Sequence, residues 1–189
     1  MNKVEPIRTK AKLDKMRNIL IGQNYRNYMI FQFSIHVGMR ISDVLELKVK
    51  DIKNKESIYV IEKKTRHRRR NKRNRFTIPK TIRKELLEYI DYEQLNNDDY
   101  LFYTSNRYCS HISRRQVYNI INAAAEKAGV TTAIGCHTLR KTFGYWHYKQ
   151  YKDVAMLQKI FNHTTPEETL TYIGVTDEQI SNTLNNFTI

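Results

Sequence analysis

The chain has 189 residues, with 33 lysines and arginines against 19 aspartates and glutamates, which gives a formal net charge of +14. This length allows one domain with a substantial core, and the excess of basic residues points to a polyanionic partner, nucleic acid before an anionic membrane. No apolar run approaches the roughly 20 residues of a membrane span, and the first residues hold no apolar signal segment. We therefore expect a cytoplasmic protein.

Helical spacing of apolar residues predicts most of the secondary structure. In chain order, the predicted helices cover residues 9–21, 25–37, 80–91, 113–128, 138–150, 153–161, 166–172 and 177–186. Gly22 and Gly38 are expected to end the first two of these helices, and Asn24 is expected to cap the second. Ser42 is expected to cap a further short helix in "SDVLEL".

Two short segments predict a single β-hairpin. Residues 57–62, "SIYVIE", are β-branched and alternating, and residues 75–79, "RFTIP", follow as an antiparallel partner that Pro79 stops. No internal repeat and no flexible linker divides the chain. The sequence thus predicts a single mainly α domain with a small antiparallel β-sheet, which is an α+β class.

The predicted tip of this hairpin is strongly basic. From Lys63 to Arg75, nine of thirteen residues are lysine or arginine and none is acidic. Such a run is often a solvated loop, but at a hairpin tip it is well placed to press against phosphates, without reading a base sequence. The predicted DNA contacts are Lys63, Arg66, Arg68, Arg69, Arg70, Lys72 and Arg73.

Two other stretches hold groups suited to a phosphate. In "VGMRISDVLEL", Arg40 stands between two predicted helices, a weak signal because an arginine in a loop is usually solvated or paired. In "GCHTLRKTFGYW", His137 and Arg140 are three residues apart and so share a helix face, with Lys141 beside them. An arginine offers forked donors to two oxygens, and a histidine can move protons.

The stretch "FNHTTPEETLTYIGV" places His163 nine residues before Tyr172. Pro166 suits the first turn of a helix and not its interior, so His163 is expected in the loop at the helix entrance and Tyr172 near the exit. By itself, the stretch leaves open whether Tyr172 is a packed aromatic or a nucleophile.

Taken in order, "GMRISDVLELK", "HTLRKTF" and "IFNHTTPEETLTYIGV" resemble the tyrosine recombinases of the phage integrase family, from about Lys10 to Val175. The family pattern is an arginine, a lysine on a β-hairpin, His-x-x-Arg, a histidine or tryptophan, and a nucleophilic tyrosine. By this resemblance the catalytic residues are Arg40, Lys64, His137, Arg140, His163 and Tyr172. Lys64 is chosen over Lys63 because "KT" after the strand looks like the family's Lys-Thr turn. Asp43 and Lys141 are supporting residues, and Lys141 stands where the family often has a histidine.

The resemblance implies a site-specific recombinase that cleaves and rejoins DNA through a covalent 3′-phosphotyrosine, for integration, excision or inversion. His137 is implied as the base, the hairpin lysine as the acid, and His163 as a donor to a phosphate oxygen. No cofactor is expected: the chain has no G-x-x-x-x-G-K-[ST] loop, and its histidines show no metal-ligand spacing. The alternatives are a non-catalytic, sequence-specific DNA-binding relative and an RNA-binding basic protein.

The same resemblance sets expectations for organisation and partners. Residues 1–189 are expected to form the catalytic domain alone, without the family's usual N-terminal DNA-clamping domain, and residues 176–189 to form a tail helix with an apolar stripe. The expected partners are double-stranded DNA target sites, three further copies of the chain on DNA, and an accessory factor that sets direction. Without DNA we expect a monomer or weak dimer, and on DNA an association with the nucleoid.

Overall fold

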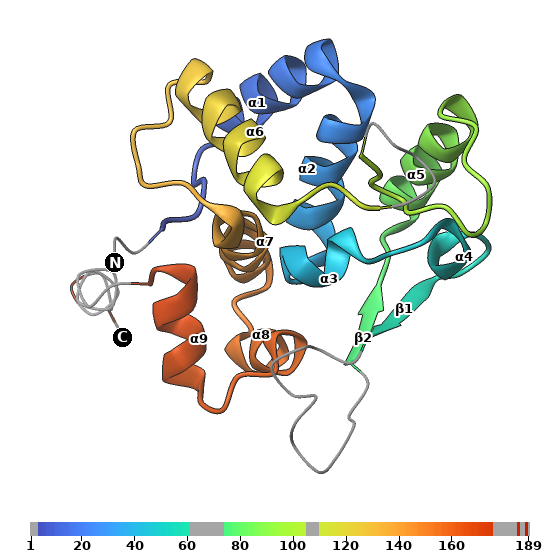
Figure 1. Cartoon of the computed structure of the whole chain (residues 1–189). Helices are drawn as coiled ribbons and strands as arrows, with labels where there is room; N and C mark the ends of the chain where they lie inside the picture. Colours follow the sequence, from blue (N-terminus) through green and yellow to red (C-terminus); the bar gives the residue numbers. More distant parts are fainter. Residues whose placement is uncertain (1–3, 61–73, 105–109, 176–184, 186–187, 189) are drawn as a thin grey trace.

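The computed structural model describes residues 4–60, 74–104 and 110–175, together with residues 185 and 188 (Figure 1). In chain order its elements are α1 (Lys10–Gln23), α2 (Tyr25–Val37), α3 (Ile41–Leu45), α4 (Val49–Ile52), β1 (Ser57–Val60), β2 (Asn74–Thr77), α5 (Lys80–Tyr92), α6 (Arg114–Lys127), α7 (Cys136–Tyr151), α8 (Val154–Phe161) and α9 (Pro166–Ile173). The predicted class, mainly helical with a small antiparallel sheet, is confirmed. Apart from residue 185, the predicted tail helix over 177–186 lies outside the described residues.

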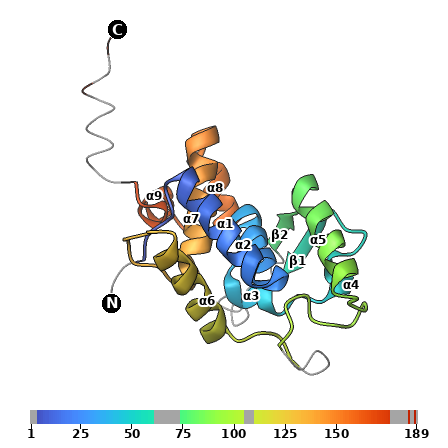
Figure 2. The ribbon, with the colours of Figure 1, turned by 90° about the horizontal axis from the view of Figure 1, so that it is seen from above.

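Helix α2 is the centre of the fold. Nine of its thirteen residues are buried, because α1, α5 and α7 all pack against it. This explains why its buried residues run without a break from Met29 to Ile35 and so lie on all sides of the helix. In both views, α5 and the β-hairpin lie on one side of α2 and α7, and α9 lies on the other (Figure 1, Figure 2).

A second, smaller apolar cluster joins the C-terminal helices. Leu157 and Phe161 of α8 and Ile173 of α9 are fully buried, and Phe143 of α7 and Tyr172 of α9 pack against them. The cluster holds α8 and α9 against α7, so residues far apart in the sequence meet at this junction.

Of the four residues predicted above to cap or end the first helices, Asn24 and Gly38 do so and Gly22 and Ser42 do not. The Asn24 side chain accepts a hydrogen bond from the Asn27 amide, and Gly38 ends α2 with a left-handed φ of 71°. Gly22 does not end α1: the helix continues to Gln23, where the extended Asn24 ends it and starts α2 at the same time. Ser42 is not a cap, because α3 begins one residue earlier, at Ile41, with Arg40 in the extended cap position.

The β-hairpin has the predicted antiparallel pairing. Ser57 faces Thr77, and Ile58 faces Phe76, with the last two side chains buried together against the core. The connection, residues 61–73, lies outside the described residues.

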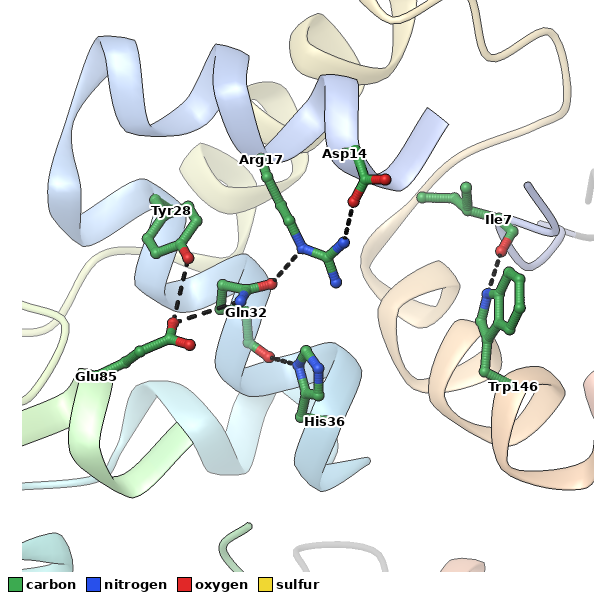
Figure 3. Close-up of polar contacts among 8 residues, drawn as sticks. All are labelled: Ile7, Asp14, Arg17, Tyr28, Gln32, His36, Glu85 and Trp146. Atoms are coloured by element: carbon green, nitrogen blue, oxygen red, sulfur yellow. Dashed lines mark hydrogen bonds and ion pairs between the residues drawn. The ribbon is translucent and has the colours of Figure 1, made fainter. Parts of the chain in front are cut away.

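A polar network links three helices beside the core (Figure 3). The Gln32 amide of α2 accepts from Arg17 Nε of α1 at 2.8 Å and donates to Glu85 of α5 at 3.4 Å. Tyr28 donates to the same Glu85 carboxylate, and burial together with the Glu85 charge raises the pKa of Tyr28 to about 12. His36 Nδ1 donates to the Gln32 carbonyl oxygen at 2.7 Å.

We expect acid to weaken the fold through His36. Burial first, and the Arg17 charge in addition, lower the His36 pKa below its ordinary value of 6.5, against the opposing effects of the Gln32 carbonyl and Glu85. The unfolded chain then takes up the proton more readily, so the unfolding free energy is full above about pH 6.5 and falls at lower pH. Urea unfolding of His36→Asn between about pH 7 and pH 5 should show a flatter pH dependence than the wild-type chain.

His147, whose pKa burial also lowers, supplies a second contribution of the same sign. The double substitution of His36 and His147 should therefore flatten the curve further. An unchanged pH dependence in both variants would contradict this account.

Candidate active site

Helix α7 carries His137 and Arg140, and Arg140 is built into the core. Only 2% of Arg140 is exposed. Its Nη1 donates to the Gly38 carbonyl at 2.7 Å and its Nη2 to the Phe161 carbonyl at 2.9 Å. The guanidinium also lies 4.6 Å from the centre of the Phe161 ring. These contacts hold a buried cation in one orientation and tie together the ends of α2 and α8.

Helix α9 carries Tyr172 and places its side chain beside Arg140. The Thr165 side chain caps the helix by accepting from the Glu168 amide, Pro166 occupies its first turn, and Gly174 ends it with a φ of 77°. The predicted loop and short helix are thus confirmed. Tyr172 stands in the last turn, so the position of its hydroxyl depends on where this short helix ends.

The Phe161 ring packs against both His163 and Tyr172. The Tyr172 ring meets it edge-on at a centroid distance of 5.3 Å, and the His163 ring lies 5.2 Å from it. His163 and Tyr172 in turn contact each other at 5.1 Å. His163 Nδ1 lies 3.1 Å from the hydroxyl of the fully buried Thr169, which fixes its orientation.

The Tyr172 hydroxyl lies 3.4 Å from His137 Nδ1, so a base faces the phenol across the α7–α9 junction. Catalytic hydrogen bonds are often long before substrate binds and tighten afterwards. Burial raises the pKa of the Tyr172 phenol above its ordinary value of 10.0, while the Arg140 and Arg40 charges act in the opposite direction. The phenol is therefore protonated at neutral pH and needs a base before it can attack.

Three more residues predicted from the sequence lie near the contact between α7 and α9. Arg40 is half-buried at the start of α3, near enough for its charge to act on Tyr172. Asp43 is buried on the same helix. Lys141 is 4% exposed and its Nζ lies 5.3 Å from the centre of the Tyr172 ring. The residues brought together around Tyr172 are Arg40, His137, Arg140, Lys141 and His163.

The hairpin candidates lie outside the described residues. They are Lys63, Lys64, Arg66, Arg68, Arg69, Arg70, Lys72 and Arg73. The described base of the hairpin does reach the site, since Asn74 and Arg75 line one hollow together with Lys159, Asn162 and His163.

Two residues of the site were missed from the sequence. Phe161 touches Arg140, His163 and Tyr172, and Thr169 orients His163. Both read as ordinary helix residues in the sequence, because their roles come only from packing between α7, α8 and α9.

Among the described residues, no three histidine, cysteine, aspartate or glutamate side chains gather in a way that could hold a metal ion. Within the same part of the chain, no helix is long and apolar enough to cross a membrane. Cys136, at the start of α7, is a free and buried thiol.

A model of the phage integrase family matches residues 9–179. The probable integrase/recombinase YoeC of Bacillus subtilis is 40% identical over 178 residues, which cover 94% of this chain and 93% of that protein. Tyrosine recombinase XerH of Campylobacter jejuni is 27% identical, over 82% of this chain and 43% of its own length. The chain therefore spans nearly all of the first relative and less than half of the second.

Solved structures share the fold at lower identity. The crystal structure of XerA recombinase aligns with a TM-score of 0.75 at 20% identity, over 96% of this chain and 64% of that one. XerH site-specific recombinase, bound to a palindromic difH substrate in a post-cleavage complex, aligns with a TM-score of 0.76 at 19% identity, over 97% of this chain and 53% of that one.

The close approach of α9 to α7 depends on Gly144. A Cβ at this position would meet Ile173 Cγ2 at 2.6 Å and the Phe161 ring at 2.7 Å. We expect Gly144→Ala to lower the unfolding free energy by up to about 2 kcal/mol, because the overpacking of about 1–3 kcal/mol exceeds the helix-propensity gain of about 1 kcal/mol. Urea unfolding measures the change.

Gly22→Ala is the matched control. Gly22 also lies within a helix, but nothing lies within 4 Å of its Cβ position, so alanine there should stabilise the protein. A gain in stability for both variants would contradict the tight α7–α9 contact.

Proposed function

Because the chain belongs to the phage integrase family, we propose that it is a site-specific tyrosine recombinase, which cleaves and rejoins DNA strands through a covalent 3′-phosphotyrosine. The observation that carries the proposal is the Tyr172 hydroxyl, 3.4 Å from His137 Nδ1 and beside the buried Arg140. A protein that only occupied DNA would not need a base facing a phenol on which two arginine charges act.

The reaction divides the work among these side chains. His137 takes the phenol proton as Tyr172 Oη bonds to phosphorus, and the bond from phosphorus to the 5′-oxygen of the next nucleotide breaks. Arg40 and Arg140 neutralise the non-bridging oxygens, on which charge gathers in the transition state. His163, oriented by Thr169, donates to one of these oxygens.

Lys64 protonates the leaving 5′-oxygen in this scheme. The assignment is supported by the hairpin base, since Asn74 and Arg75 line the same hollow as His163. The basic residues of the connection contact neighbouring phosphates, a contribution to affinity that is independent of base sequence and weakens with salt. Rejoining runs the same steps backwards, and because the phosphotyrosine keeps the bond energy, no ATP is consumed.

The carbonyl contacts of Arg140 give it a second task. Two of its five N–H donors hold the Gly38 and Phe161 carbonyls, which presents the rest of the guanidinium in a fixed plane. Arg140→Ala would remove a buried structural contact as well as a charge on the phosphate. Arg40, which is half-buried, gives the cleaner test of transition-state stabilisation.

The partners follow from the same chemistry. Recombination joins two duplexes, so the active assembly is four copies of the chain on paired double-stranded target sites, with residues 1–189 as the catalytic unit. An accessory factor sets direction, and the work is done in the cytoplasm at the nucleoid.

The tail, residues 176–189, leaves just after the Tyr172 helix and connects these copies. Its apolar stripe, Ile180, Leu184 and Phe187, packs on a neighbouring copy. An apolar hollow between β2, α7 and α8, lined by Phe76, Phe143, Tyr151, Met156 and Ile160 among others, is a described surface that fits such a stripe.

We expect Tyr172→Phe to bind target DNA as the wild-type chain does and to form no covalent adduct, since only the attacking oxygen is lost. Target duplexes are first selected from a random pool by binding, and then nicked so that cleavage traps the protein. Arg40→Ala should form the adduct about a hundredfold more slowly at unchanged affinity. A covalent band with Tyr172→Phe on a denaturing gel would assign the nucleophile elsewhere, and no band with the wild-type chain would favour a non-catalytic DNA-binding relative.

We expect a chain that ends at Val175 to fold, to bind a single target site and to lose assembly on paired sites, because the tail is absent. Sedimentation of the two chains on paired duplexes measures the assembly. A truncated chain that still assembles, or one that unfolds, would show that the tail packs only on its own subunit.

A further inference from the structure

A segment before the first helix is attached to α7. In residues 4–9, which we call the N-terminal strap, Ile7 is 1% exposed and its amide donates to the Thr142 hydroxyl at 2.9 Å. The Ile7 carbonyl accepts from Trp146 Nε1 at 2.9 Å (Figure 3). The Glu5 amide donates to the Ala133 carbonyl at 2.9 Å, so the strap is held at both ends of this short run.

From the strap, Arg8 contacts the C-terminal end of α9, the helix that carries Tyr172. Arg8 Nη2 donates to the Gly174 carbonyl at 3.0 Å, and the same nitrogen pairs with Glu5 at 3.2 Å. The guanidinium lies 5.2 Å from the centre of the Tyr145 ring of α7. A cation at a helix C-terminus is favourable, because it satisfies a carbonyl and complements the helix dipole.

Gly174 is two residues from Tyr172, and its neighbourhood is filled by the strap. A Cβ on Gly174 would meet Arg8 Nη2 at 2.5 Å and Glu5 Oε2 at 3.3 Å. The strap is anchored on α7, which carries His137, while Arg8 grips the end of α9, which carries Tyr172. The contact therefore bridges the two helices whose side chains must meet for the reaction.

We propose that Arg8 is a positioning residue, which holds the C-terminal end of α9 against α7 and so keeps the Tyr172 hydroxyl facing His137. The proposal rests on the recombinase function argued above. The family match begins at residue 9, so Arg8 and the anchored part of the strap lie outside it. Arg8 touches neither DNA nor the phosphate in this role: it acts through the backbone of Gly174.

Arg8→Gln tests the contact. A displacement of about 1 Å at a reacting group can slow a reaction by up to about a hundredfold. We expect covalent adduct formation at saturating DNA to slow by about tenfold to a hundredfold, with affinity for the selected duplex unchanged. Arg8→Lys, which can still reach the carbonyl with a charged donor, should restore part of the rate.

Lys149→Gln is the matched control. Lys149 lines the same surface hollow as Arg8, and its Nζ lies 5.0 Å from the centre of the Trp146 ring. Lys149→Gln removes the same charge and leaves the hydrogen bond from Arg8 to the Gly174 carbonyl in place. The adduct rate of this variant should therefore stay at the wild-type value. Equal losses of affinity in the Arg8→Gln and Lys149→Gln proteins would make Arg8 a phosphate contact and overturn the proposal.

Hydrogen exchange gives a readout that needs no DNA. The Gly174 amide donates to Thr171 and the Val175 amide to Leu170, at the end of α9 that Arg8 holds. In Arg8→Gln these two amides should exchange faster, while those of the α2 core keep their protection. Unchanged exchange at both amides would overturn the proposal, whatever the activity, and if the wild-type chain formed no adduct, this arm alone would decide it.

Gly174→Ala approaches the same contact from the other side, because its Cβ displaces the Arg8 guanidinium. Gly129→Ala isolates the backbone strain, since Gly129 has a similar φ of +73° and nothing lies within 4 Å of its Cβ position. If Arg8 acts through Gly174, the slowing of adduct formation by Gly174→Ala shrinks in the Arg8→Gln background. Fully additive effects would overturn the proposal.

Discussion

The buried guanidinium of Arg140 is the interaction on which the site depends. It holds the carbonyl that follows α2 and the carbonyl that ends α8, and it lies over the Phe161 ring. A buried cation needs several such partners to offset its desolvation. Because these partners come from two segments and Arg140 itself from a third, its charge and the packing that closes the C-terminal helices on the core cannot be altered independently.

The second constraint is the distance between α7 and α9. Gly144 lets the helices approach, Phe161 fills the space between them, and Arg8 fastens the far end of α9. The outcome is a phenol that faces a base but stays protonated, because burial raises the pKa of Tyr172 more than the arginines lower it. In the proposed reaction, a phenol in this state stays unreactive until a base takes its proton.

Much of this could be predicted from the sequence, because helices such as α5, α6 and α8 carry strong apolar periodicity and the three motifs have the order and spacing of the family. The prediction that Tyr172 follows a loop bearing His163 is confirmed by the structure, whereas the predicted cap at Ser42 is wrong, because Arg40 takes that position. Phe161 and Arg8 could not be predicted: each acts through contacts between segments that local propensity does not encode. The assignment of the acid to the hairpin stays a prediction, since its residues lie outside those described.

The identity of the nucleophile is the central claim, and mapping the covalent adduct tests it most directly. The wild-type chain is trapped on nicked target duplex, digested with trypsin and nuclease, and examined by mass spectrometry. Residues 160–189 contain no lysine or arginine and a single tyrosine, so the C-terminal tryptic fragment reports on Tyr172 alone. We expect the nucleotide mass on that fragment. The same mass on residues 142–149, which contain Tyr145 and Tyr148, would contradict the account.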